Sequence, residues 1–245
     1  MSDVIVIGVA GGTGSGKTTL LRIINGLACH FYQGRLEGDI SVSGMVPASA
    51  SLPELARVVG SVFQNPRTQF FHTDTTGELA FQLENQNMPR EQMRRRLDQV
   101  VTELGLESLM ERSIFALSGG EKQQIACGSV YASMPQVVVL DEPSSNLDLE
   151  SIRKLRGLLE TMKASGVTIL VSEHRLWYLH GLADRYLLLE SGKLRGDLTP
   201  EQMTALDPQT RQALGLRAVD RWQLFSLCPQ ARPKEWMEPG LELRS

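Results

Sequence analysis

A glycine-rich segment near the start of the chain carries residue types that bind phosphate groups. It fits the pattern G-x-x-x-x-G-K-[ST], and its residues are Gly11, Gly12, Thr13, Gly14, Ser15, Gly16, Lys17 and Thr18, with Thr19 next in the chain. Glycines let backbone N–H groups curl around phosphates at a helix start, the lysine adds positive charge, and the threonine hydroxyl can ligate Mg²⁺. The segment therefore predicts a site for ATP or GTP with Mg²⁺.

Two acidic residues, Asp141 and Glu142, follow the apolar run 137–140. Four consecutive apolar residues are typical of a buried parallel strand, and open α/β sheets place ligand chemistry at the carboxyl ends of such strands. Asp141 would belong to the Mg²⁺ shell, and Glu142 would orient or deprotonate an attacking water. Two acids could instead cap the next turn, but the phosphate-binding pattern upstream favours the catalytic interpretation.

A second candidate anion site reads Leu-Ser-Gly-Gly-Glu over residues 117–121. Its last four members are Ser118, Gly119, Gly120 and Glu121. A serine hydroxyl and two glycine N–H groups at a helix start can bind an anion, although this pattern alone is more often a helix cap with a capping acid. Because the segment precedes the strand that ends in Asp141 and Glu142 by one helix, the chain resembles the ABC ATPase family from Val4 to about Gly196.

This resemblance implies roles for residues that no local pattern identifies. Gln64 would contact Mg²⁺ or water, His174 would contact the γ-phosphate, and Asp148 lies in a segment that would reach across a dimer. From spacing alone, His174 would be an ordinary surface or core histidine. The resemblance also implies that two such subunits pair head to tail, so that each ATP lies between the phosphate-binding segment of one subunit and residues 117–121 of the other.

Three segments are similar to a narrower group, the ATPases of energy-coupling-factor (ECF) transporters, notably members with tandem ATPase domains. The segments are 62–71, 77–85 and 172–179. Such transporters import vitamins, vitamin precursors or transition-metal ions. The similarity implies a second ABC ATPase, the same chain or a related one, and two membrane subunits, one for coupling and one that binds the substrate. These partners would place the chain at the cytoplasmic face of the cell membrane, with the coupling subunit docked on residues 64–85.

Each of these interpretations has an alternative. Residues 64–85 could form a packed loop with buried Phe70, Phe71 and Phe81. The chain could also be a soluble ABC ATPase that acts on ribosomes or DNA, although such proteins usually carry long coiled coils or basic arms, and neither is visible in this sequence. A third alternative is a weakly active half of an asymmetric ATPase dimer. The presence of all the expected polar residues argues against it: Lys17, Gln64, Ser118, Asp141, Glu142 and His174.

The composition is typical of a globular protein with a substantial core. The 245 residues are 42% hydrophobic and 22% charged, and the net charge of −3 argues against broad electrostatic capture of nucleic acid. No apolar stretch approaches the roughly 18 residues of a membrane span, and no secretory signal pattern follows Met1, so we expect a cytoplasmic location. The cysteines have no disulfide or metal-ligand spacing and are predicted to be free thiols: Cys29, Cys127 and Cys228.

Strand and helix signals alternate along the chain and predict an α/β fold. Strands are expected at 4–9, 38–44, 58–63, 137–140 and 167–171, with a hairpin at 191–192; helices are expected at 17–26, 89–106, 119–132 and 152–162, and from residue 199. The helical spacing within 89–106 would leave the basic run 94–96 largely on the solvated side. With the family resemblance, this order implies a P-loop NTPase (RecA-like) core with a helical ABC signature subdomain.

The resemblance also suggests domain limits. Residues 1–200 would form the ABC ATPase domain, with the RecA-like core at about 1–75 and 134–200 and the helical subdomain at about 76–133. Residues 201–245 would be a C-terminal extension, irregular at 229–239, that leads to the start of another cassette at 240–245. Because the phosphate-binding segment begins at Gly11, the family's N-terminal antiparallel strands and the aromatic residue that stacks on adenine are expected to be largely missing. We therefore expect a piece of a longer or tandem protein. ATP binding no tighter than GTP binding would support the loss of the adenine contact, and a strong preference for ATP would show that something else holds the adenine.

Overall fold

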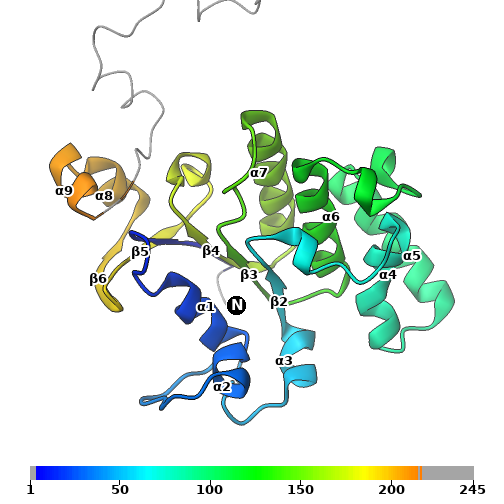
Figure 1. Ribbon diagram of the computed structural model, residues 1–245, viewed down its shortest axis with the longest axis horizontal. Helices are drawn as coiled ribbons and strands as arrows, with labels where there is room; N and C mark the ends of the chain where they lie inside the picture. The colour runs from blue at the N-terminus through cyan, green and yellow to red at the C-terminus, as the bar shows by residue number, and fades with distance from the viewer. Residues whose placement is uncertain (1–3, 215, 217–245) are drawn as a thin grey trace, which may run out of the picture.

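The computed structural model describes residues 4–214 and 216, whose centre is a six-stranded sheet of order β2-β3-β4-β1-β5-β6 (Figure 1). Every neighbouring pair is parallel except β5 with β6. The strands are β1 (Val6–Ala10), β2 (Val59–Val62), β3 (Val137–Asp141), β4 (Thr168–Glu173), β5 (Arg185–Glu190) and β6 (Lys193–Leu198). The helices are α1 (Lys17–Ile24), α2 (Leu27–Phe31), α3 (Leu52–Val58), α4 (Thr75–Asn85), α5 (Arg90–Leu104), α6 (Gly119–Ala132), α7 (Leu149–Ala164), α8 (Pro200–Ala205) and α9 (Pro208–Ala213).

Helices cover both faces of this sheet, as a parallel sheet with apolar strands requires. α1 lies on one face and α7 on the other (Figure 1). Successive residues of β3 point to opposite faces: Val138 and Leu140 belong to the large core that includes α6 and α7, whereas Val137 and Val139 belong to a smaller core with Leu21 of α1. The α/β fold with a P-loop NTPase-like sheet is therefore confirmed.

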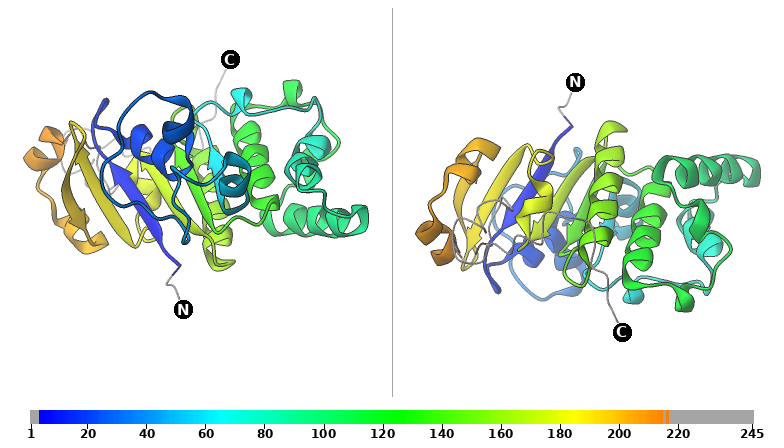
Figure 2. Two further views of the ribbon diagram at one scale, coloured as in Figure 1. Left: turned by 90° about the horizontal axis from the view of Figure 1, so that it is seen from below. Right: turned by 90° about the horizontal axis from the view of Figure 1, so that it is seen from above.

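Helices α4, α5 and α6 pack together beyond the β2 end of the sheet (Figure 2). α6 belongs to both parts of the molecule, because it also packs against β2 and α7. Its observed bounds match the expected ones, and the predicted hairpin at Ser191 and Gly192 is present as the antiparallel pair β5 and β6. No helix among the described residues is long and apolar enough to cross a membrane.

The expected strand at 38–44 is wrong. In place of a strand, the structure shows an isolated bridge from Val42 to Met45, the residue just after the segment. The physical reason is the pair of glycines that bound it: Gly38 and Gly44 adopt φ of 93° and 81°, in the left-handed region that extended strands exclude. The alternation of side chains there therefore does not produce a sheet strand.

The basic run 94–96 lies only partly on the solvated side. Arg94 and Arg95 are exposed, but the Arg96 side chain is only 10% exposed. Arg96 donates to the carbonyls of Tyr131 (2.7 Å) and Ala132 (3.2 Å), and its guanidinium lies 4.7 Å from the centre of the Tyr131 ring. The prediction was wrong for this residue. Arg96 lies three residues after Met93 and four before Val100, so it shares their side of the helix and faces the end of α6.

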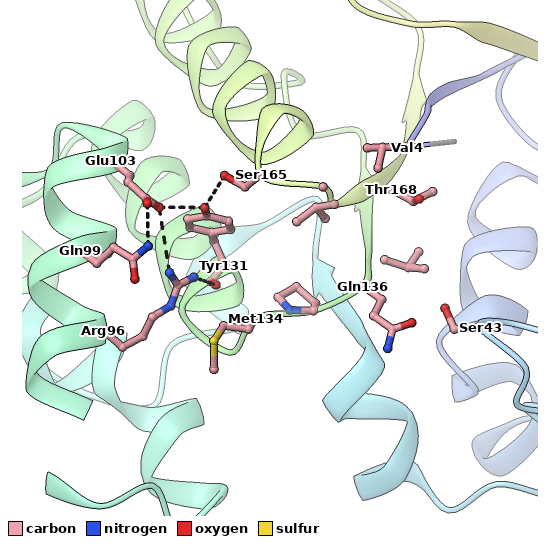
Figure 3. A pocket seen from close by; sticks show the side chains of 14 residues that line it. Val4, Ser43, Arg96, Gln99, Glu103, Tyr131, Met134, Gln136, Ser165 and Thr168 are labelled. Carbon is pink, nitrogen blue, oxygen red and sulfur yellow. Dashed lines mark hydrogen bonds and ion pairs between the residues drawn. The ribbon is translucent and has the colours of Figure 1, made fainter. Parts of the chain in front are cut away.

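These Arg96 contacts line a polar cleft of about 770 Å³ at the amino ends of β3 and β4 (Figure 3). Tyr131 donates from its hydroxyl to Glu103, and its oxygen also contacts Ser165 at the end of α7. The network ties α5, α6 and α7 together at the edge of the sheet opposite the phosphate-binding segment.

Cys29 and Cys127 are free thiols, as expected, and burial raises the pKa of Cys127 to about 12. Three features expected from the sequence lie outside the described residues: Cys228, the irregular segment 229–239 and the strand-like segment 240–245.

The close approach of α6 to β2 gives a test of the packing. A methyl group at Gly60 would overlap Cγ1 of Val130, so we expect Gly60→Ala to lower the free energy of unfolding by about 1–3 kcal/mol. The measurement is urea denaturation of the wild type and the variant. The double variant Gly60→Ala/Val130→Ala makes room for the methyl group, and its loss should be smaller than the sum of the two single losses. An unchanged urea midpoint for Gly60→Ala would contradict this account of the packing.

Candidate active site

The phosphate-binding segment connects the end of β1 to the start of α1. Gly14 and Gly16 have φ of 75° and 98°, which only glycine adopts without strain. Gly16 occupies the N-cap of α1 and no side chain caps the helix, so the first N–H groups of α1 remain available to an anion. Thr13 and Gly14 are exposed at the tip of the loop, and Thr19 is exposed on the first turn of α1.

Lys17 and Ser15 turn polar atoms into this loop. Lys17 is 4% exposed, and its Nζ donates to the carbonyls of Gly11 (2.8 Å) and Gly12 (3.1 Å). Burial lowers the pKa of Lys17, and the carboxylates of the site act in the opposite direction. Among the residues that the structure describes, the buried Ser15 hydroxyl has no hydrogen-bond partner. A phosphate group would supply the acceptor that this hydroxyl lacks, so the segment fits the group that its sequence predicts.

A hydroxyl and a carboxylate suited to Mg²⁺ lie next to the loop. The Thr18 hydroxyl donates to Oδ1 of Asp141 at 3.2 Å. Both side chains are partly buried, and oxygen is the ligand atom that Mg²⁺ prefers. The two residues, 123 positions apart in the chain, are thus brought together as the sequence analysis expects.

Glu142 connects the remaining candidate residues. Its Oε1 lies 2.8 Å from Nε2 of His174, and its Oε2 accepts from Nε2 of Gln64 at 3.1 Å. His174 also lies 3.5 Å from Nζ of Lys17. Glu142 has φ of 45°, an uncommon value for a residue with a side chain, and strained backbone of this kind is typical of functional sites.

The segment 118–121 lies apart from this cluster. Within the described residues, no hydrogen bond or ion pair joins it to residues 11–18. Ser118 and Glu121 cap α6 reciprocally: the Ser118 hydroxyl accepts from the Glu121 N–H at 3.2 Å, and the Glu121 carboxylate accepts from the Ser118 N–H at 2.7 Å. The Ser118 N–H and then Arg112, at 2.8 Å, lower the pKa of Glu121 to about 2. The Glu121 side chain is therefore held within its own chain.

The glycines of this segment lie beside the segment that leads to Asp148. Gly119 and residues 145–147 line one side of a cleft of about 450 Å³, with Gln64 also at its wall. A methyl group at Gly120 would overlap the Ser151 hydroxyl, so the starts of α6 and α7 touch. Asp148 caps α7 by accepting from the Ser151 N–H at 2.7 Å, and this bond lowers the pKa of Asp148.

Phe71 is exposed, which contradicts its part in the packed-loop alternative for residues 64–85. Phe71 is 73% exposed and stacks on the half-buried Phe81 with ring centres 4.6 Å apart, whereas Phe70 packs against the core. The loop is held by Glu78, which is 1% exposed and accepts from the N–H groups of Phe71 and His72, both at 2.9 Å.

Sequence reasoning did not identify Glu173 as part of the site. It is buried at the end of β4, directly before His174, and its carboxylate binds backbone N–H groups of both neighbouring loops. The available signal was an acid at the carboxyl end of an apolar strand, the same signal that identified Asp141 and Glu142.

The chain is similar to known ABC transporter proteins. A family model described as ABC transporter matches residues 3–145. A protein of Treponema denticola named as an ABC transporter ATP-binding protein is 48% identical over 209 residues, which are 85% of this chain and 43% of that protein. One of Sulfurisphaera tokodaii with the same name is 36% identical over 81% of this chain and 42% of its own length. The chain thus spans less than half the length of these curated relatives.

A solved structure has the same fold. It is cbiO1 from Clostridium perfringens, described as part of the ABC transporter complex cbiONQ. The two chains superpose with a TM-score of 0.75 at 25% sequence identity, and the match covers 92% of this chain and 87% of the other. The match of the family model to more than half of the sequence shows that this chain belongs to the ABC transporter family.

Proposed function

We propose that the chain binds ATP with Mg²⁺ and hydrolyses it to power transport. The observation that carries this proposal is the cluster in which the Glu142 carboxylate contacts both His174 and Gln64 beside Lys17. Phosphoryl transfer to water needs a carboxylate that activates the water, a polar group that contacts the transferred γ-phosphoryl group, and a cation that stabilises its charge.

The residues would divide the reaction among themselves. Lys17 and the first N–H groups of α1 bind the phosphates, and Thr18 and Asp141 would hold Mg²⁺, which neutralises charge on the phosphate oxygens. Glu142 takes the proton of the attacking water, and His174 donates a hydrogen bond to the γ-phosphate. His174 and Gln64 each contact one oxygen of Glu142, and because a carboxylate oxygen can accept two hydrogen bonds, an acceptor position remains for the attacking water.

We further propose that two such subunits complete each other's sites head to tail. The supporting observation is that residues 118–121 lie apart from the phosphate-binding segment of the same chain. Among the described residues, no hydrogen bond or ion pair joins the two segments. The start of α6, together with Gly119 and Asn146 along the neighbouring cleft, would then face the nucleotide of a second subunit. The second subunit is this chain or a related ABC ATPase.

The transporter that we propose is an importer of the ECF type for a vitamin, a vitamin precursor or a transition-metal ion. The similarity of residues 62–71, 77–85 and 172–179 to ECF ATPases supports this, as does the fold shared with an ATPase from the multi-component complex cbiONQ. A membrane coupling subunit and a substrate-binding membrane subunit would then hold the chain at the cytoplasmic face of the membrane. The limits proposed above for the ATPase domain, 1–200 with a helical part at 76–133, fit this assignment.

The exposed face around Phe71 is our candidate for the coupling subunit's docking site. Phe71 and the 39% exposed Phe63 line a cleft of about 240 Å³ between β2, α4 and α6. Gln64 follows Phe63 directly, so a partner seated in this cleft would press on the residue that contacts Glu142. Docking and hydrolysis would be linked by this short path.

Glu142→Gln tests the catalytic role of Glu142. The amide cannot accept the proton of water, so we expect ATP turnover to fall at least about 100-fold while ATP binding persists. Steady-state phosphate release and equilibrium binding of a fluorescent ATP analogue measure the two effects. Glu150→Gln, an exposed change on α7, should leave both unchanged. Near-normal hydrolysis by Glu142→Gln would remove Glu142 from the role of general base.

Lys17→Ala tests phosphate binding. Loss of the buried cation beside the Gly11 and Gly12 carbonyls should weaken the affinity for ATP, because a charged contact to phosphate is not replaced. A fluorescent ATP titration measures the dissociation constant. An affinity equal to that of the wild type would show that the nucleotide binds elsewhere.

Phe71→Glu tests the docking face. A carboxylate at this exposed position should not disturb the fold, but it should abolish an apolar contact with a membrane subunit. We expect the variant to be lost from the membrane fraction when the chain is expressed with its native membrane partners. Phe31→Glu is the matched control, because Phe31 is 69% exposed and lies on α2, away from the cleft. Equal retention of both variants on membranes would contradict the assignment.

A further inference from the structure

One buried carboxylate beside the candidate active site has no role in the mechanism above. Glu173 is the last residue of β4 and is 1% exposed. Burying a carboxylate is strongly unfavourable unless hydrogen bonds replace its hydration. The groups that donate to Glu173 therefore show which parts of the chain it holds.

Each oxygen of Glu173 accepts two hydrogen bonds. Oε1 accepts from the backbone N–H of Ser144 and from the Tyr178 hydroxyl, both at 2.9 Å. Oε2 accepts from the N–H groups of His174 and Arg175 at 3.0 and 3.3 Å. Burial, and then the charge of Glu173, raise the pKa of Tyr178 well above its ordinary value, so its hydroxyl remains a donor.

Arg175 contacts the same segment of chain. Its Nη1 donates to the carbonyls of Ser144 at 3.4 Å and Leu147 at 3.3 Å. Residues 144–147 begin two positions after Glu142. The two residues that flank His174 thus bind the segment that follows Glu142.

We propose that Glu173 is a positioning residue for ATP hydrolysis, which acts by fixing the backbone of His174 relative to the segment that follows Glu142. This inference rests on the proposed function. The His174 ring reaches Glu142 at 2.8 Å and Lys17 at 3.5 Å, so a backbone shift of about 1 Å would break the catalytic alignment. Three of the four partners are backbone N–H groups, which can only donate, and they lie at both oxygens, so only a group that accepts at both ends satisfies them.

Glu173→Gln is the first variant. Its amide keeps the shape of the side chain but presents N–H groups to one pair of donors. We expect kcat for ATP to fall about tenfold or more while KM changes less than about threefold, because the misplaced group acts in the transition state rather than in binding. The measurement is steady-state hydrolysis by the full chain, purified with any subunits that it retains. Thermal unfolding checks that the variant is folded. If Glu173→Gln does not fold, Glu173→Asp replaces it, with the same expected fall in kcat and the same small change in KM.

The double variant Glu173→Gln/His174→Ala tests whether the effect passes through His174. In the His174→Ala background, Glu173→Gln should lower kcat by less than about twofold, because residues that act as one unit are not additive. A full tenfold loss in that background would overturn the inference. A rise in KM with unchanged kcat in the single variant would overturn it as well.

Tyr178→Phe is the matched control, since it removes one of the four donors and leaves the carboxylate in place. We expect its kcat to stay within about threefold of the wild type, because the loss of one hydrogen bond disturbs the site less than amide N–H groups that face backbone donors. A loss as large as that of Glu173→Gln would overturn the inference, because any disturbance of this buried region would then suffice. A wild type that does not hydrolyse ATP would overturn the proposed function itself, whereas active wild type with fully active Glu173→Gln would overturn only the positioning role.

Discussion

The carboxylate of Glu142 joins three parts of the chain that are distant in sequence. Gln64 follows β2, Glu142 follows β3 and His174 follows β4. These strands are neighbours and parallel, so their carboxyl ends meet at one edge of the sheet. β1 pairs with β4 and delivers Lys17 to the same edge. The strand order β2-β3-β4-β1 is therefore the condition for the site, because any other order would separate these contacts.

The two faces of the sheet stabilise this edge in different ways. Val138 and Leu140 of β3 bury themselves under α6 and α7, and Val137 and Val139 do so under α1. β3 is packed on both faces and hydrogen-bonded to β2 on one side and β4 on the other, so Asp141 and Glu142 emerge from a strand whose position is fixed by its neighbours. The uncommon φ of Glu142 is supported by this packing and by its N–H, which donates to the carbonyl of Ser172 at 2.9 Å.

Local patterns predicted the parts of the structure that local chemistry determines. The phosphate-binding segment is contiguous, and its conformation depends on its own glycines, so Gly11 to Thr18 could be placed from the sequence. The capping box of Ser118 and Glu121 likewise fixed the start of α6 where it was expected. The failures depend on distant partners. Arg96 is buried by carbonyls at the end of another helix, and the four donors of Glu173 come from two loops that meet only in the folded chain.

The contact between Gly120 and Ser151 constrains how the starts of α6 and α7 can move relative to each other. With no side chain at Gly120, the first turn of α6 rests directly on the first turn of α7, and a methyl group would force them apart. This close packing couples the positions of the two helix starts, because separating them would lose their van der Waals contacts. A displacement of the glycine at 120 would therefore reach α7, and with it Asp148 at the N-cap of that helix, through the Ser151 side chain.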